Sequence, residues 1–102
     1  MKGTNREGSH GMARYALLVT FGDKAKRDEV RPTHREYLKS LYDEGTLIFS
    51  GPFADDDGAL IMYECSDEAA ARAQFAADPY SQAESVVADV QFREWKQVLP
   101  PT

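Results

Sequence analysis

The pattern of apolar and polar positions along this chain predicts four strands. Residues 15–21 are rich in β-branched and aromatic side chains and stop at Gly22, as is typical of a strand. Residues 47–50 and 59–65 form two more such runs, and the turn-forming residues between them predict a hairpin. A longer final strand, interrupted by polar side chains, is predicted over residues 86–98.

Two segments between these runs have helical character instead. Pro32 is expected at the first position of a helix, because proline lacks an amide hydrogen and fixes φ near the helical value. Gly45 is expected to end that helix. A second helix, rich in alanine, is predicted from a cap at Ser66 or Asp67 through Ala77. Helices and strands therefore alternate along the chain.

The order of the elements is strand, helix, strand, strand, helix, strand, which predicts a ferredoxin-like α+β fold. In that βαββαβ fold, an antiparallel sheet carries both helices on one face. Alternation in residues 15–21 places Tyr15 and Leu17 on one face and Ala16 and Leu18 on the other, so both faces are apolar. The face without helices predicts a partner, and a homodimer is the simplest one.

Length and the first residues define the expected domain. A chain of 102 residues suits one core, so residues 12–102 are expected to form a single domain. Residues 1–11 have no hydrophobic period, and their last residues resemble a cloning scar. We therefore interpret residues 1–11 as an expression-tag remnant and exclude them from the fold.

Charge and cysteine content narrow the class of protein. The chain has 12 basic and 17 acidic residues, a net charge of −5, and no basic cluster, so nucleic acid is a poor partner. No apolar run reaches the roughly 20 residues of a membrane span, and we expect no membrane association. The single cysteine, Cys65, fits a reducing compartment, which predicts a cytoplasmic protein. Cofactor-binding motifs are missing, and no cofactor is expected.

His34 is the histidine outside the leader and the main candidate for chemistry. In the predicted helix it follows Pro32 by two residues, beside the free amide hydrogens and the positive end of the helix dipole. We expect that field to favour a neutral imidazole, which can accept a proton. Leu38 and Leu41 share its stripe, so a structurally paired core histidine is the alternative. With one histidine, no metal site is expected.

Asp78 is the candidate partner of His34, because it lies at the break after the second helix. In the ferredoxin-like fold, the start of the first helix and the end of the second can reach the same edge. A carboxylate there would fix the tautomer and orientation of the imidazole. Asp-Pro is also a common turn, which is the alternative role. Arg31 is expected either to bind an anionic group or to form an exposed ion pair.

Three more residues are candidates for substrate contacts. Gly51 and Pro52 offer a close backbone approach after the second strand, although turns share this pattern. Tyr80 would either line a cleft or fill the core. Residues 55–57, three aspartates, are interpreted as a solvated turn rather than as a cation site.

Four short motifs carry a resemblance to a known family. They are Arg31-Pro32-Thr33-His34, residues 43–47 leading into Gly51-Pro52, Asp78-Pro79-Tyr80 and residues 92–96. In their order and spacing, over nearly the whole chain after the leader, they resemble the YciI-like (YCII-related domain) family.

The resemblance implies a dimeric ferredoxin-like fold of the α/β-barrel type, and an active site built on a His-Asp pair, here His34 and Asp78. Similar proteins include dehydrochlorinases of hydroxylated chloroaromatics, and the fold is similar to that of muconolactone isomerases. The segment between Gly51 and Gly58 departs from the family, which often has a longer glycine-rich insertion there. Substrate specificity is therefore not carried over.

Two functional hypotheses follow from these residues. The first is a small cofactor-independent lyase or isomerase, with His34 as general acid/base, oriented by Asp78, on a small phenolic or enolisable substrate. Arg31 or the helix N-terminus would hold an anionic oxygen of that substrate. The alternative is a non-catalytic dimeric ligand-binding or accessory module with the same pocket.

Overall fold

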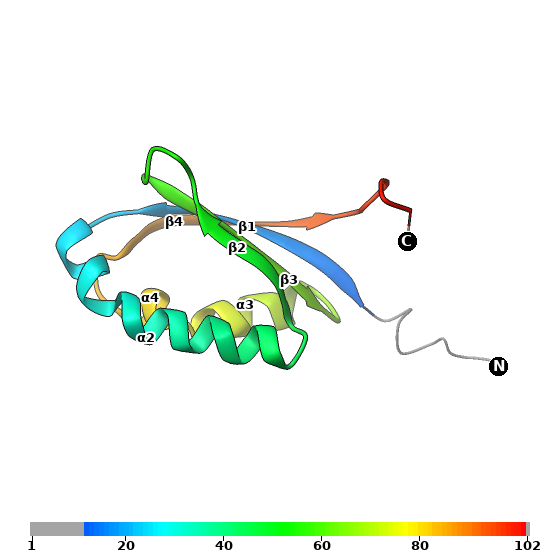
Figure 1. Ribbon diagram of the computed structural model, residues 1–102, viewed down its shortest axis with the longest axis horizontal. Helices are drawn as coiled ribbons and strands as arrows, with labels where there is room; N and C mark the ends of the chain where they lie inside the picture. Colours follow the sequence, from blue (N-terminus) through cyan, green and yellow to red (C-terminus); the bar gives the residue numbers. More distant parts are fainter. Residues whose placement is uncertain (1–11, 102) are drawn as a thin grey trace.

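Four antiparallel strands form one sheet in the order β2-β3-β1-β4 (Figure 1). The computed structural model describes residues 12–101, and the expected tag remnant lies outside them. The central strands are β1 (Ala13–Phe21) and β3 (Gly58–Cys65), and the edge strands are β2 (Leu47–Pro52) and β4 (Val87–Trp95). The predicted hairpin of β2 and β3 is confirmed by their antiparallel pairing.

All helices lie on one face of this sheet (Figure 1). They are α2 (Lys24–Asp43), α3 (Glu68–Ala76) and the short α4 (Pro79–Gln82). The predicted cap of the second helix is Asp67, whose carboxylate accepts a hydrogen bond from the Ala70 amide at 2.8 Å. The ferredoxin-like βαββαβ prediction is therefore confirmed. Among residues 12–101, no helix is both long and apolar enough to cross a membrane.

The predicted start of the first helix is wrong. Helix α2 begins at Lys24, where the side chain of Asp23 caps it by accepting from the Lys26 amide at 3.0 Å. Pro32 therefore lies inside the helix, at the expense of one intrahelical hydrogen bond. His34 is consequently an interior residue of α2, and the expected influence of a helix N-terminus on it does not apply.

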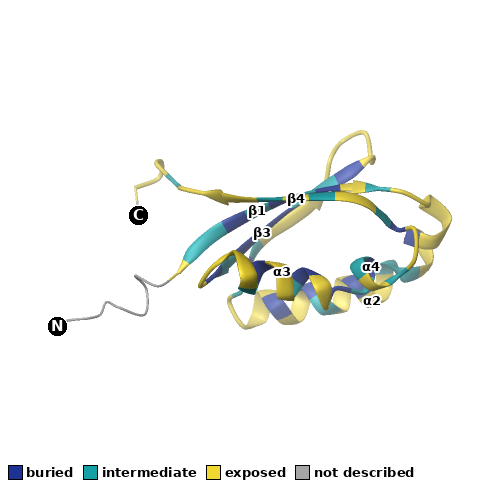
Figure 2. Cartoon of the chain, turned by 180° about the vertical axis from the view of Figure 1, so that it is seen from behind, coloured by how far each residue is buried: buried dark blue, intermediate teal, exposed yellow. Residues whose placement is uncertain are grey.

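The core lies between the sheet and the helices. Leu17, Val19, Ile61 and Tyr63 are buried on the helix-facing side of the central strands, and Phe75 packs on them from α3. Figure 2 shows buried positions on these strands and on the helices below them. Burial of such side chains contributes about 1.5–3 kcal/mol each, so this layer holds α2 and α3 on the sheet.

The opposite face of the sheet carries apolar side chains without covering helices. Ala16 pairs with Met62 and Leu18 with Leu60 across β1 and β3, so these four side chains share that face. Phe49 faces the same way, because it pairs with Met62, and it is 47% exposed. The predicted apolar character of both faces is therefore observed.

Candidate functional site

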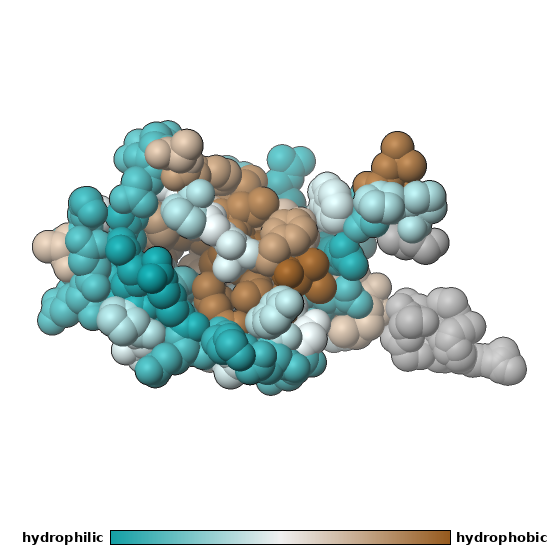
Figure 3. All heavy atoms as spheres, in the orientation of Figure 1, coloured by the Kyte–Doolittle hydropathy of each residue, from teal (hydrophilic) through white to brown (hydrophobic). Residues whose placement is uncertain are grey.

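A cavity of about 390 Å³ opens between α2 and the β2–β3 hairpin. In Figure 3 it is the hollow in which apolar side chains are visible between hydrophilic rims. The larger apolar side chains of its wall are Val19, Phe21, Leu38, Ile61 and Phe75. A volume of this size suits a small organic molecule.

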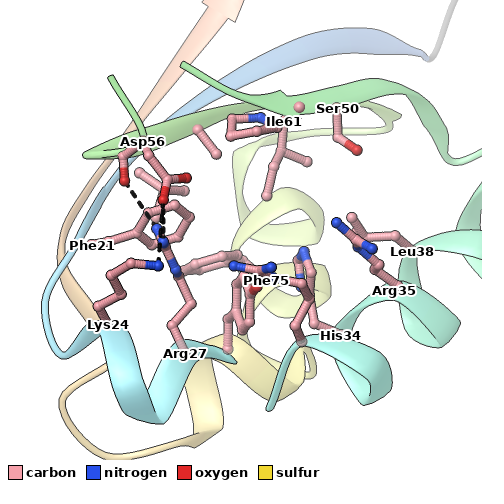
Figure 4. Close-up of a pocket in the computed structure, with 16 residues that line it drawn as sticks. Phe21, Lys24, Arg27, His34, Arg35, Leu38, Ser50, Asp56, Ile61 and Phe75 are labelled. Atoms are coloured by element: carbon pink, nitrogen blue, oxygen red, sulfur yellow. Dashed lines mark hydrogen bonds and ion pairs between the residues drawn. The ribbon is translucent and has the colours of Figure 1, made fainter. Parts of the chain in front are cut away.

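His34 and Asp78 meet at the helical side of this cavity. The Nδ1 atom of His34 lies 2.8 Å from Oδ1 of Asp78, which is completely buried. Because a carboxylate only accepts, Nδ1 donates and Nε2 is the nitrogen left for other partners. The imidazole lines the cavity and points into it (Figure 4). The pair thus presents one ring nitrogen to any bound molecule.

Asp78 is held in place by its own segment. Its Oδ1 also accepts a hydrogen bond from the Tyr80 amide at 2.8 Å, so Asp78 is the N-cap of α4. The same oxygen of Asp78 therefore caps the turn and pairs with His34, so both expected roles are observed. Its other oxygen, Oδ2, is buried and has no hydrogen-bond partner among residues 12–101. The carboxylate directs its polar contacts toward the imidazole and the cap.

Tyr80 fixes the plane of the imidazole. Its ring stacks on His34 with centroids 3.6 Å apart and an interplanar angle of 5°, and Phe21 packs edge-on against it. Tyr80 is buried and also lines the cavity, so both expected roles are observed. The hydrogen bond to Asp78 and the stacking on Tyr80 together restrict the orientation of the imidazole ring.

An ion pair between Arg27 and Asp56 lies at one end of the cavity (Figure 4). Arg27 is buried, and its Nη2 and Nη1 donate to Oδ2 of Asp56 at 2.6 Å and to the Asp56 carbonyl at 3.0 Å. The guanidinium also lies 4.2 Å from the centre of the Phe21 ring. Hydrogen bonding to Arg27 lowers the pKa of Asp56. The acidic turn is therefore tied to α2 at Asp56, which the interpretation as a solvated turn missed.

The other predicted contact residues also line the cavity. Arg31 does so from the interior of α2, with Nη2 donating to Oδ1 of Asp28 at 2.7 Å, and the Tyr80 hydroxyl raises its pKa. Gly51 and Pro52 are the last two residues of β2, and they lie in the cavity wall. A Cβ at Gly51 would meet no atom within 4 Å, so the space beside this backbone is open, and the close approach of a ligand to it stays a prediction.

Sequence reasoning missed four polar residues of this wall, namely Lys24, Arg27, Arg35 and Ser50. Arg27 carries the one recognisable signal, because it lies seven positions before His34 on the stripe that continues to Leu38. That signal is visible only if the helix is extended back to Lys24. Lys24, Arg35 and Ser50 resemble ordinary surface residues in the sequence.

The arrangement suits proton transfer. An imidazole held by a buried carboxylate beside a half-apolar cavity can accept a proton at Nε2 and return it. No group of three or more His, Cys, Asp or Glu side chains in residues 12–101 is placed to hold a metal ion. Residues from α2, from β2 and from the turn between β2 and β3 supply the remaining polar wall.

Comparisons with known proteins agree with this fold. The profile of the YCII-related domain matches residues 13–96. The chain is similar to a 5-chloro-2-hydroxyhydroquinone dehydrochlorinase from Burkholderia phenoliruptrix, solved in complex with 2,5-dihydroxybenzoquinone. The TM-score is 0.67 at 18% identity, covering 86% of this chain and 99% of that chain. No curated protein matches the chain.

A second solved structure is also similar. It is a protein from Bacteriodes thetaiotaomicron described as an antibiotic biosynthesis monooxygenase, with a TM-score of 0.64 at 12% identity. The match covers 91% of this chain and 95% of that chain. At these identities the two likenesses show a shared fold, and the chemistry of this chain has to be argued from its own residues.

Proposed function

Because this chain belongs to the YCII-related domain family, we propose that it is a small cofactor-independent lyase or isomerase. The observation that carries the proposal is the 2.8 Å contact between His34 Nδ1 and the buried Asp78, with the imidazole facing a cavity. A catalytic base needs this combination of orientation and access. The substrate would be small and phenolic or enolisable.

In the proposed reaction, Nε2 of His34 removes a proton from a C–H or O–H group of the substrate. The electron pair left behind is delocalised into the conjugated substrate. In an isomerisation, His34 returns the proton at another atom, whereas in an elimination the electron pair expels the leaving group as an anion and His34 releases the proton to water. Asp78 stabilises the imidazolium formed in between. Arg31, which lines the same wall, supplies positive charge that stabilises the anion formed in between.

The dehydrochlorinase neighbour supports the choice of substrate class for a test. Its named substrate is a chlorinated hydroxyhydroquinone, and a molecule of that size is compatible with a cavity of about 390 Å³. We therefore propose 5-chloro-2-hydroxyhydroquinone as the first compound to try, followed by a set of phenols and enolisable lactones with and without a carboxylate. Chloride release and ultraviolet spectra would report elimination and isomerisation, respectively.

The decisive variant is His34→Ala. A positioned general base contributes about 10²–10⁴-fold to a rate, so we expect a loss of that size in kcat/KM. Lys39→Gln is the control, since Lys39 lies on the same helix but its exposed ammonium pairs with Asp43. Retention of turnover in folded His34→Ala would overturn the acid/base role. Tight binding of one compound by the natural protein without any turnover would favour the non-catalytic binding module.

Orientation of the imidazole can be tested without a substrate. ¹⁵N NMR of neutral His34 should show the proton on Nδ1, because Asp78 accepts it. In Asp78→Asn, the amide can also donate to Nδ1, so we expect a mixture of tautomers. The signal is assigned by its absence from His34→Ala. Identical tautomer ratios in both proteins would contradict the proposed role of Asp78.

We also propose that the uncovered sheet face forms a homodimer. Leu18, Leu60 and the partly exposed Phe49 and Trp95 give that face an apolar surface in a chain whose net charge is −5. Symmetric pairing is the commonest way to cover such a face. Light scattering should give twice the chain mass, and Leu18→Glu should convert the protein to monomers. A monomeric natural protein would refute this proposal.

A further inference from the structure

We propose that the ligand of this cavity is a small ring-containing carboxylic acid, and that Arg35, together with Arg31, binds its carboxylate. The inference rests on the proposed function, because one molecule would reach both His34 and this arginine pair. Arg31 was expected to bind an anion, whereas Arg35 was not recognised from the sequence. Its assignment defines the class of acid that the cavity would accept.

The first argument is the arrangement of charge on α2. Lys24, Arg27, Arg31 and Arg35 follow one another at helical spacing and all line the cavity. We call these four residues the cationic stripe. Among residues 12–101, Asp56 is the only one that contributes a carboxylate to this wall. The wall is therefore positively charged although the whole chain has a net charge of −5, and the electrostatic field at such a wall attracts anions.

The second argument is which of these cations already has a partner. Lys24 lies 3.5 Å from Asp28 and 3.8 Å from Asp56, and Arg27 is paired with Asp56. Arg31 shares Asp28. Arg35 makes no ion pair or side-chain hydrogen bond with any residue in the described part of the chain. Like charges one helical turn apart repel each other weakly, and an anion bound by both Arg31 and Arg35 would relieve that repulsion.

The third argument is position. In Figure 4, Arg35 lies at the opposite end of the cavity from Lys24, Arg27 and Asp56, and His34 lies between the two ends. Ser50 extends toward the cavity from β2, across from Arg35. A bound molecule could thus have its carboxylate at Arg35 and its reacting atom beside His34.

The rest of the wall accounts for the ring. Leu38, Ile61 and Phe75 provide apolar surface next to His34, which suits a flat, unsaturated carbon skeleton. A guanidinium matches a carboxylate through two parallel hydrogen bonds, which an isosteric amide cannot reproduce. The cavity would therefore discriminate between an acid and its neutral amide more than between rings of similar size.

Calorimetry with 4-hydroxybenzoate and 4-hydroxybenzamide tests this directly, since the two probes differ mainly in charge. The natural protein should bind the acid about tenfold or more tightly than the amide, as expected for a charge-assisted hydrogen bond. Arg35→Gln should remove most of that preference, and Lys39→Gln, on the exposed side of the same helix, should keep it. Circular dichroism confirms that each variant is folded.

The inference fails if acid and amide bind equally, if neither binds at millimolar concentration, or if folded Arg35→Gln keeps the preference for the acid. Tighter binding of phenyl phosphate than of 4-hydroxybenzoate would also overturn it, in favour of a phosphate ester. These outcomes need no turnover, so they are independent of catalysis. Arg35-dependent binding of the acid alongside an unchanged His34 tautomer in Asp78→Asn would instead keep this inference and refute the proposed function.

Discussion

Two side chains of α2, those of His34 and Arg27, each pair with an aspartate from another segment beside the cavity, and the two pairs differ in which partner is buried. In the first, Asp78 is fully buried, and the imidazole of His34 faces the cavity. In the second, the Arg27 guanidinium is 3% exposed, and the carboxylate of Asp56 is 49% exposed. The contact distances, 2.8 and 2.6 Å, are nearly equal.

The difference in burial separates two roles for similar chemistry. A buried carboxylate cannot be reached by a ligand, so its effect is transmitted through the imidazole that it orients. A buried guanidinium with a solvated carboxylate does the reverse, because it anchors a surface loop to the helix. The contact distances do not distinguish these two roles. The solvent exposure of the two partners in each pair does. The following variants test the distinction.

The largest loss of stability is expected from Asp78→Ala. It removes both the bond to His34 and the cap of α4, so we expect the free energy of unfolding to fall by about 2–3 kcal/mol. Asp67→Ala is the matched control, since Asp67 caps α3 at the same 2.8 Å distance from an exposed position. Asp67→Ala should reduce the free energy of unfolding by about 1 kcal/mol. Equal losses in urea denaturation would show that Asp78 acts as a cap alone.

Asp56→Asn should have a smaller effect that depends on pH. Arg27 lowers the pKa of Asp56 from its ordinary value of 3.8, so this pair stabilises the fold above that pH. The stabilisation is lost as the pH falls through the lower pKa of the folded state. Urea denaturation from pH 7 to pH 2 should therefore show the natural protein and Asp56→Asn converging toward acid. A constant difference between them would contradict the role of the ion pair.

Arg27→Met should cost less than Asp56→Asn, because it leaves a half-exposed carboxylate that water can solvate. Met keeps an unbranched apolar stem, and the Nε of Arg27 has no hydrogen-bond partner among residues 12–101. We expect the free energy of unfolding to fall by about 1 kcal/mol. The His34 tautomer should be unchanged by ¹⁵N NMR. A shift in that tautomer would mean that the two pairs are coupled.

The smallest effect is expected from Tyr80→Phe. The variant keeps the ring stacked on His34 and loses only the hydroxyl beside Arg31. Thermal unfolding should therefore change by no more than about 0.5 kcal/mol. Tyr80→Leu is the informative comparison, because it removes the flat surface and should broaden the His34 ring signals. If both substitutions broaden these signals equally, the hydroxyl orients the site as much as the stack.

Part of the fold could be predicted from the sequence because it depends on residue types at short spacing along the chain. The four strands, the hairpin and the Asp67 cap follow from residue types at fixed spacing. The start of α2 was missed for a physical reason, since a charged residue, Arg27, occupies a core-facing position that only its distant partner Asp56 makes acceptable. Proline inside the helix then suggested a boundary at Pro32 that tertiary packing overrides.

The candidate site divides in the same way. His34 and Asp78 could be identified as residue types, but their contact depends on how two separate helical segments pack. Arg35 could not be identified, because the sequence pattern around an exposed arginine is the same whether its side chain faces solvent or the rim of a cavity. Its significance depends on which neighbouring cations already have partners, and that information exists only in three dimensions.

The pair of His34 and Asp78 spans 44 positions of the chain, so the cavity beside it is complete only when the whole domain is folded. Any molecule that binds there must therefore raise the melting temperature. A ligand at a hundred times its Kd adds about 2.7 kcal/mol of stability, and each kcal/mol raises Tm by roughly 4–8 °C in a domain of this size. Thermal unfolding can therefore rank candidate acids and phenols by their affinity before any reaction is known.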